Sequence, residues 1–236
     1  MGELKDKAIT GVKWNAIGRF STQGVNFVIG LVLARLLSPS DYGIVGMVGI
    51  FFAIAQTFID SGFGSALIRK NDCDDTDYST AFFFNIAVAI VCCICLSLAS
   101  PFIANFFNTP VLKDIVRVMS LNMLIGSFAI VHSTKLTHSI DFKSQAIVGL
   151  ITAILSGSVG IVLAYKGLGV WSLVFQNLIA TIVRVILLFM YTQWVPQWRF
   201  SKESFRYLFG FGSRILTASL LHTVYSNMTT LIIGKV

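Results

Sequence analysis

The sequence predicts an all-α polytopic membrane protein. Of its 236 residues, 55% are hydrophobic and only 12% are charged, whereas roughly a quarter of the residues are charged in a soluble domain. The apolar residues are gathered into long runs, and short polar links separate these runs. This pattern is typical of helices that cross a membrane in succession.

Seven apolar runs have the length that a membrane helix needs. A bilayer core about 30 Å thick is crossed by about 20 helical residues. Charged residues, proline or glycine close the runs, except for the last, which continues to the end of the chain. The expected helices are 11–36, 43–67, 78–100, 115–135, 145–165, 169–191 and 209–236.

The first link, LARLLSPSDYG at 33–43, predicts a tight hairpin at one membrane surface. Arg35 closes the first helix, and Pro39 prevents that helix from continuing. Ser40 and Asp41 are residue types that cap the start of a helix, so we expect them to cap the second one.

Two other short motifs have structural interpretations. DCDDTD at 72–77 is similar to an acidic metal or sugar-nucleotide motif, but it lacks the glycine and the terminal glutamate of a calcium loop. We therefore expect a solvated loop that caps a helix. Small residues favour close helix packing in membranes, and this role is expected for Gly43, Gly46, Gly49 and the run SGSVG at 156–160.

The distribution of lysine and arginine predicts a cytoplasmic N-terminus, because positive residues are enriched in cytoplasmic links. In this orientation ten basic residues flank the inner links and four flank the outer links. The long link after residue 191 then lies on the inner surface, with Tyr191, Trp194 and Trp198 at the interface. The first residues lack the apolar core and cleavage site of a signal peptide, so no removable signal is expected.

Composition and motifs disfavour several classes of function. The net charge of +7 is scattered between apolar runs, so a nucleic-acid partner is not expected. Cys92, Cys93 and Cys95 have no histidine or carboxylate beside them for a metal site. The sequence contains no phosphate-binding loop, dinucleotide fingerprint or metal-spaced histidine cluster. We therefore expect no catalytic residue, no cofactor and no metal, and a protein that is not an enzyme.

Polar side chains form stripes on several of the expected helices, because positions i, i+4, i+7 and i+11 share one helical face; the stripes of the first and sixth helices contain an arginine. An arginine deep in a membrane helix costs about 2.5–3.5 kcal/mol on insertion scales and therefore favours an aqueous cavity. Its planar guanidinium suits phosphate oxygens. The stripes predict a hydrated, cationic cavity for a polyvalent anion. They are Asn15, Arg19, Thr22 and Asn26 in the first helix and Asn177, Thr181 and Arg184 in the sixth.

Structural roles stay open for the same charges. Arg19 and Arg184 can also extend to the inner interface or pair with Asp60. Arg214, near the start of the seventh helix, can assist at the anion site or extend to the interface. Asp60, with Gln56 one turn earlier, is a candidate for ion coupling or a partner for a basic residue.

Two long blocks resemble a known family. They are LARLLSPSDYGIVGMVGIFFAIAQTFIDSGFGSALIRK at 33–70 and IVHSTKLTHSIDFKSQAIVGLITAILSGSVGIVLAYKGLGVWSLVFQNL at 130–178. The sequence is similar to the polysaccharide transporters of the multidrug/oligosaccharidyl-lipid/polysaccharide (MOP) exporter superfamily. Within that branch it resembles the Wzx-type flippases that include colanic acid and teichuronic acid exporters. The likeness extends over nearly the whole chain.

The resemblance implies a MOP-type flippase fold with twelve or more helices in two lobes. Residues 1–207 would form the N-terminal six-helix lobe with its cytoplasmic connector, and residues 208–236 would begin the C-terminal lobe. GLVLAR, ending at Arg35, is echoed by TLIIGK, ending at Lys235, as expected for lobes repeated in parallel. We therefore expect the sequence to be part of a longer protein and not to transport alone.

The implied function is export at the inner membrane of a bacterium. An undecaprenyl-diphosphate-linked oligosaccharide would move from the inner to the outer leaflet by alternating access, for lipopolysaccharide or exopolysaccharide biosynthesis. Membrane lipids and the polysaccharide polymerase machinery are the implied partners. The expected site residues are Arg19, Arg184 and Arg214 for the diphosphate, and Asn15, Thr22, Asn26, Asn177 and Thr181 for the sugars or ordered water.

Three alternatives stay open. A drug or metabolite exporter of the same fold would prefer acidic cavity residues. A membrane-embedded glycan polymerase or ligase would need a large outer loop with catalytic residues, and none of the outer links is long. A non-transporting assembly subunit would depend on its packing glycines and not on its polar stripes.

Overall fold

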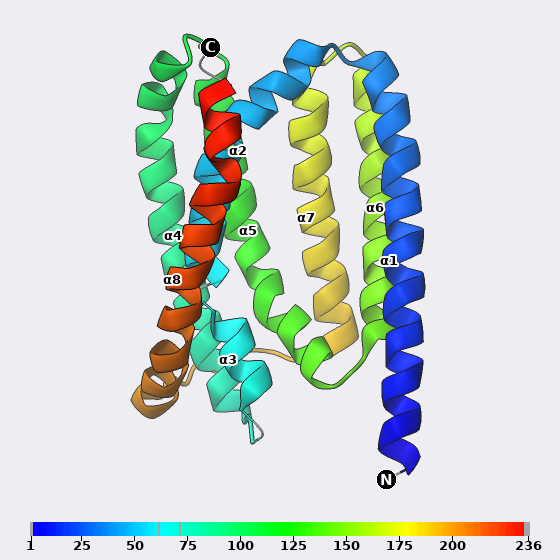
Figure 1. The fold of residues 1–236 in the computed structure, drawn as a ribbon, viewed down its shortest axis with the longest axis vertical. Coiled ribbons are helices and arrows are strands. Elements are labelled where there is room, and N and C mark those ends of the chain that lie inside the picture. Colours follow the sequence, from blue (N-terminus) through cyan, green and yellow to red (C-terminus); the bar gives the residue numbers. More distant parts are fainter. Residues whose placement is uncertain (1, 61, 71, 234–236) are drawn as a thin grey trace. The chain divides into compact units, whose positions relative to one another are not determined.

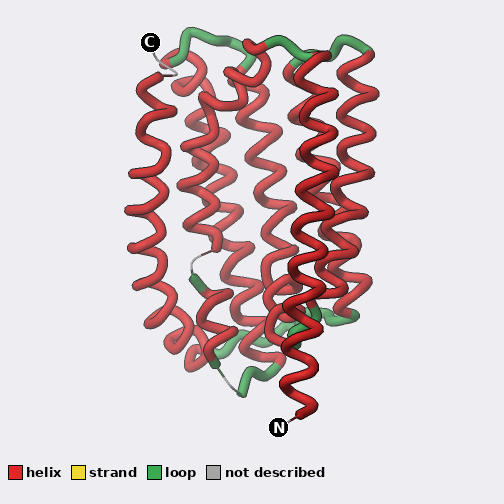
Figure 2. Tube along the Cα trace, turned by 45° about the vertical axis from the view of Figure 1, so that its right-hand side comes forward, coloured by secondary structure: helices red, strands yellow, loops and turns green. Residues whose placement is uncertain are grey.

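The fold is helical throughout the described residues, which are 2–60, 62–70 and 72–233 in a computed structural model of the chain. Side chains are described for 10–60, 62–70 and 72–226. Within these ranges eight helices are joined by short loops, with no strand (Figure 1; Figure 2). The all-α prediction is confirmed. The helices are α1 (Gly2–Leu36), α2 (Pro39–Asp60), α3 (Phe63–Arg69), α4 (Asp75–Phe106), α5 (Leu112–His138), α6 (Phe142–Tyr165), α7 (Val170–Thr192) and α8 (Lys202–Ile233).

Six segments of the described chain are long and apolar enough to cross a membrane, which confirms a multi-pass membrane protein. The seventh expected span is helical, as α8, but it is not among these six. Polar residues inside the expected span, such as Arg214, His222 and Thr223, lower its apolar content. The six segments are Thr10–Leu36, Pro39–Arg69, Asp75–Phe106, Leu112–His138, Phe142–Tyr165 and Val170–Thr192.

The second expected helix, 43–67, is divided into α2 and α3 at a glycine. Gly62 has a φ of 69°, in the left-handed region, where a residue without Cβ pays no steric cost. A Cβ at this position would also lie 2.7 Å from the carbonyl oxygen of Gly212 in α8. Gly62 therefore ends the helical path and lets α8 approach closely.

The capping expectations had different outcomes. Pro39 is the first residue of α2, so Ser40 and Asp41 lie inside its first turn and the prediction that they cap it was wrong. Proline is suited to this place because an N–H there has no helical partner. The expectation for the acidic loop is confirmed, because Asp74 caps α4. Its carboxylate accepts from the N–H of Asp77 at 2.8 Å, and the carboxylate of Asp77 accepts from the N–H of Asp74 at 3.1 Å.

The described chain forms two compact units, whose boundaries fall after residue 38, within α5 after residue 130, and after residue 195. Unit 1 contains α1, the end of α5, α6 and α7. Unit 2 contains α2, α3, α4, most of α5 and α8. The expected lobes, 1–207 and 208–236, concern a longer protein, and that division stays a prediction. Lys235, the last residue of the segment TLIIGK that is similar to GLVLAR, lies outside the described residues.

Small residues bring α1 and α6 together in unit 1. A Cβ at Gly18 would overlap the side chain of Ala146, and a Cβ at Gly157 would overlap Ile29. The later residue of α1, Ile29, meets the later residue of α6, Gly157. The two helices therefore run parallel, side by side (Figure 1). The packing role predicted for the run at 156–160 is thus confirmed at Gly157.

The glycines of α2 do not have the packing role predicted for them. A Cβ added at Gly43, Gly46 or Gly49 would meet nothing within 4 Å. Unit 2 is instead held by a hydrophobic core of buried side chains from α2, α4 with the residue after it, and α5. This core consists of Val48, Phe52, Ala55, Ile59, Ala89, Ile103, Ala104, Phe107, Leu112, Val116 and Met123.

Candidate functional site

The polar stripe of α1 lines a cleft in unit 1, named here the Arg19 cleft, with a volume of about 1060 Å³. Asn15, Arg19 and Thr22 come from α1. Thr137 from α5 and Gln145 from α6 face them across the cleft. The spacing in the first helix therefore gathers three of the predicted residues at one opening.

A second cleft of unit 1, the Arg184 cleft, has a volume of about 340 Å³ and walls from four helices. Thr22 and Asn26 of α1 and Arg184 of α7 line it. The structure thus brings Arg184 of the second stripe to the same cleft as Thr22 and Asn26 of the first, about 160 residues earlier in the sequence. The other polar residues that line the Arg184 cleft are Ser133 of α5 and Gln145, Thr152 and Ser156 of α6.

Both clefts carry positive charge without a balancing carboxylate. Each has one arginine, and among the described side chains no aspartate or glutamate lines either cleft. Arg19 donates from Nε to Oδ1 of Asn15 at 3.0 Å, which orients its guanidinium. Among the described side chains, neither Arg19 nor Arg184 takes part in an ion pair. Most of their N–H donors are therefore available to an anion.

The polar residues of α6 were missed in the sequence, although the signal was present. Gln145, Gly149, Thr152 and Ser156 follow the same i, i+4, i+7, i+11 spacing as the stripe of α1. Among the described residues, the buried hydroxyl of Thr152 has no hydrogen-bond partner. A buried hydroxyl without a partner costs free energy, so a ligand or water in the cleft would satisfy it.

The other two predicted residues of α7 do not line either cleft. Asn177 donates to the carbonyl of Leu173 at 2.9 Å, and Thr181 donates to the carbonyl of Asn177 at 3.1 Å. Their side chains thus hydrogen-bond to their own helix. Their predicted contact with sugars or water stays a prediction, and of this stripe only Arg184 lies in a cleft.

Arg214 and Asp60 belong to unit 2. Arg214 is exposed on α8. Asp60 is exposed at the end of α2, where its Oδ1 accepts from Nε2 of Gln56 at 3.0 Å. Gln56, one turn before Asp60, is thus a hydrogen-bond partner of its carboxylate. The roles expected for Arg214 and Asp60, in anion binding and in ion coupling, stay predictions.

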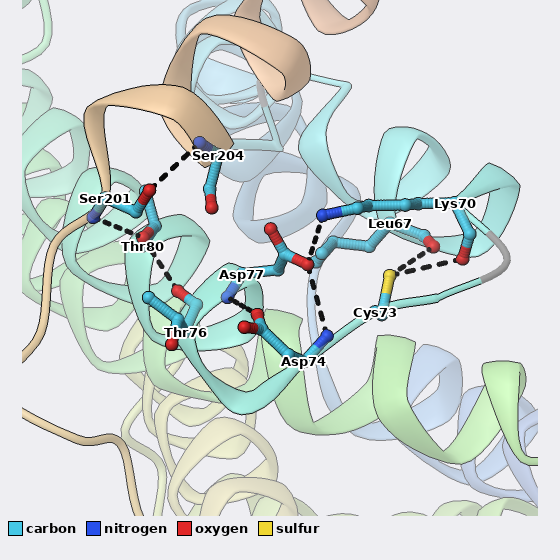
Figure 3. Close-up of polar contacts among 9 residues, drawn as sticks. All are labelled: Leu67, Lys70, Cys73, Asp74, Thr76, Asp77, Thr80, Ser201 and Ser204. Carbon is cyan, nitrogen blue, oxygen red and sulfur yellow. Dashed lines mark hydrogen bonds and ion pairs between the residues drawn. The ribbon is translucent and has the colours of Figure 1, made fainter.

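The link between α7 and α8, residues 193–201, is anchored in unit 2 by two buried hydroxyl groups. Ser79 and Thr80 each donate their hydroxyl proton to a carbonyl one turn earlier in α4. Their oxygens are left to accept, and they receive the N–H of Gln197 at 3.0 Å and of Ser201 at 3.1 Å; Figure 3 shows the second contact. The link is thereby held against the first turns of α4.

An ion pair lies beside this anchor. Lys70 Nζ donates to a carboxylate oxygen of Asp77, whose side chain is only 1% exposed (Figure 3). Burial alone would lower the pKa of Lys70, but the hydrogen bond and charge of Asp77 outweigh it and raise that pKa above its ordinary value. The pair therefore joins the end of α3 to the start of α4 at neutral pH.

The tryptophans of the link have different environments. Trp198 is 94% exposed, as expected for an interfacial residue. Trp194, expected at the interface too, is only 7% exposed. It packs edge-on against His132, and Lys135 Nζ lies 5.0 Å from the centre of its ring. Trp194 is therefore a core residue of unit 1.

Comparisons with known proteins give one consistent family. A family model described as "Polysaccharide biosynthesis protein" matches residues 32–236. The lipopolysaccharide biosynthesis protein WzxC of Escherichia coli is 24% identical, and the alignment covers 99% of this chain and 48% of the relative. The teichuronic acid biosynthesis protein TuaB of Bacillus subtilis is also 24% identical, with coverage of 100% and 49%.

A third relative is named as a transport protein. The succinoglycan biosynthesis transport protein ExoT of Rhizobium meliloti is 26% identical over 84% of this chain and 40% of the relative. The chain thus spans about half the length of the curated relatives it matches. No solved structure gives a significant match. Since the family model covers most of the described helices, the chain belongs to the polysaccharide biosynthesis protein family, with the Wzx-type exporters among its relatives.

Proposed function

We propose that the protein translocates an undecaprenyl-diphosphate-linked oligosaccharide from the inner to the outer leaflet of a bacterial inner membrane, by alternating access and without enzymatic chemistry. The observation that carries this proposal is the pair of adjoining clefts with Arg19 and Arg184 and no lining carboxylate. A diphosphate is the anionic part of such a lipid, and guanidinium groups bind phosphate oxygens through two parallel hydrogen bonds.

The lining of the clefts also suits the glycan. Asn26, Ser133, Gln145 and Thr152 line the Arg184 cleft, and their hydroxyl and amide groups are of the kind that exchange hydrogen bonds with sugar hydroxyls. Arg214 of unit 2 is proposed as an assisting cation and Asp60 as a coupling carboxylate. The polymerase machinery that uses the exported unit is the proposed partner.

The proposed orientation places the N-terminus in the cytoplasm, because ten basic residues flank the inner links and four flank the outer links. The Arg19 cleft then lies nearer the cytoplasm than the Arg184 cleft, since α1 runs outward. This order matches the direction of export, because the substrate is assembled on the inner side.

A drug or metabolite exporter of the same fold is the nearest alternative. Cationic drugs would need carboxylates in the clefts, and the lining residues include none. Export of anionic metabolites would use the same arginines, so the substrate itself must be measured.

The test uses a strain in which the gene is deleted and then restored. Mass spectrometry would quantify the lipid-linked oligosaccharide, alongside surface polysaccharide. We expect the deletion to accumulate the intact lipid-linked unit and to lose surface polymer. Wild type should restore export, whereas Arg19→Ala/Arg184→Ala should not.

The matched control is Arg117→Ala, since Arg117 is a half-exposed arginine of α5 whose nearest carboxylate, Asp114, lies 3.9 Å away. It should restore export fully. Normal surface polymer in the deletion strain, with no second exporter present, would refute the proposed function.

A further inference from the structure

The two clefts share two lining residues, Thr22 of α1 and Gln145 of α6. Asn15 and Arg19 line only the first cleft, and Asn26 lines only the second. The clefts therefore adjoin at one place along α1, between Arg19 and Asn26.

Gln145 is fixed at this junction by hydrogen bonds to α5. Its Nε2 donates to Oγ1 of Thr137 at 2.9 Å and lies 3.5 Å from the carbonyl oxygen of Ser133. Thr137 lines the Arg19 cleft and Ser133 lines the Arg184 cleft. The amide thus holds one side of the junction in a defined position, and its Oε1 can accept from a ligand.

Gly149 follows Gln145 by one turn on the same face of α6, and it lines the Arg184 cleft. Among the described residues outside the nearby backbone of α6, an added Cβ would meet within 4 Å only Oγ1 of Thr22, at 3.3 Å. This contact is already close, so a side chain here would press against Thr22 and narrow the junction. The distance between the helices is set elsewhere, by Gly18 against Ala146 and by Gly157 against Ile29.

We infer that the two clefts form one continuous ligand channel through a neck made by Thr22, Gln145 and Gly149, and that Gly149 keeps this neck open. One extended ligand then spans both clefts, in contact with Arg19 and Arg184 together. This inference rests on the proposed function for the identity of the ligand, and it adds the three neck residues to the binding site.

The test is ligand protection of two single cysteines, Asn15→Cys in the Arg19 cleft and Asn26→Cys in the Arg184 cleft. Each is made in the full-length protein with the native cysteines replaced, and the protein is reconstituted in lipid. A charged thiol reagent labels the cysteine with and without undecaprenyl diphosphate carrying a disaccharide. We expect this probe to slow labelling at both positions over the same concentration range.

Gly149→Val should uncouple the two positions. Both cysteines should still react without the probe, which shows that the variant is folded, but the probe should protect at most one of them. Gly149→Ala should give an intermediate loss. The matched control is Gly24→Val on α1, because a Cβ at Gly24 meets nothing within 4 Å, and it should behave as wild type.

The outcomes separate the neck from the proposed function. Protection of both cysteines in Gly149→Val, as strong as in wild type, would overturn the channel while leaving the flippase proposal intact. If the probe protects neither cysteine in wild type, the proposed lipid-linked substrate is refuted, and the channel inference fails with it.

Discussion

At the scale of single residues, the two cleft arginines differ in how they are held. Arg19 is oriented by Asn15 of its own helix. Arg184 has polar neighbours from α1, α5 and α6 around its cleft. Arg184 is exposed, and the polar residues that share its cleft are uncharged, so we expect its charge to act on an anionic ligand in the cleft.

Replacement of Arg184 should therefore weaken binding of the diphosphate probe. Hydrogen bonds to charged groups contribute about 1.5–3 kcal/mol, which corresponds to roughly a ten- to hundredfold weaker Kd for Arg184→Gln. Arg184→Lys keeps the charge but loses the planar fork, so its loss should be smaller. Binding to purified protein in nanodiscs would measure both, and equal affinity of Arg184→Gln and wild type would exclude Arg184 from the site.

The ion pair of unit 2 gives a second prediction at this scale. Lys70→Met leaves the buried carboxylate of Asp77 without its cation. Such a loss costs about 3–5 kcal/mol in a fully buried pair, and it should cost less here because the side chain of Lys70 is 30% exposed. Thermal unfolding in detergent should show a clear loss of stability, and Lys70→Met/Asp77→Asn should recover part of it. A Lys70→Met variant as stable as wild type would contradict this account.

The same pair predicts a pH dependence. Because the pKa of Lys70 is raised in the folded protein, its contribution to stability is complete below the ordinary lysine value of 10.5 and is lost as the pH rises through the raised value. Unfolding temperatures of wild type should thus fall above pH 10.5 more steeply than those of Lys70→Met.

At the scale of helices, small residues decide which elements approach closely. Gly18 and Gly157 remove side-chain volume where α1 and α6 are in contact, and Gly62 does so between α3 and α8. The glycines of α2 have open space beside them. Glycine alone in a membrane helix therefore does not identify a contact, since the facing residue on the second helix is also required.

The α1–α6 contact can be tested directly. Gly157→Val should destabilise unit 1, because its side chain would overlap Ile29 and overpacking costs about 1–3 kcal/mol. Gly30→Val is the control, since a Cβ at Gly30 meets nothing within 4 Å. The unfolding temperature should fall for Gly157→Val only. Restoration by Ile29→Ala in the Gly157→Val background would identify the clash as the cause.

At the scale of the whole molecule, six candidate membrane spans follow one another along the described chain. Successive spans are expected to cross in opposite directions, and the charges of their links predict which links are cytoplasmic. The N-terminal link and the link at 193–201 should both lie on the cytoplasmic side. The link between α4 and α5, which carries Thr109 and Pro110, should lie on the outer side.

Single cysteines in two links test this topology in intact cells. An impermeant thiol reagent should label Lys113→Cys from outside, because this residue follows the link between α4 and α5. It should label Arg199→Cys only after the membrane is made permeable. The reverse pattern would invert the orientation and with it the cytoplasmic position of the Arg19 cleft.

The sequence by itself determined that this is a membrane protein of successive helices in a polysaccharide biosynthesis family. Apolar runs of sufficient length and the specific blocks at 33–70 and 130–178 carry that information locally. The stripe of α1 was also readable, because side chains that share a helical face follow a fixed spacing. Asn15, Arg19, Thr22 and Asn26 accordingly all line the clefts.

Only the tertiary structure decided which polar residues share a site with that stripe. Arg184 lines a cleft, whereas Asn177 and Thr181 of the same stripe bond to their own helix. Gln145 and Thr152 of α6 enter the site because α6 packs beside α1 at Gly18 and Gly157. The spacing of residues fixes a face within one helix, but the rotation and depth of neighbouring helices are set by side-chain packing between segments far apart in sequence.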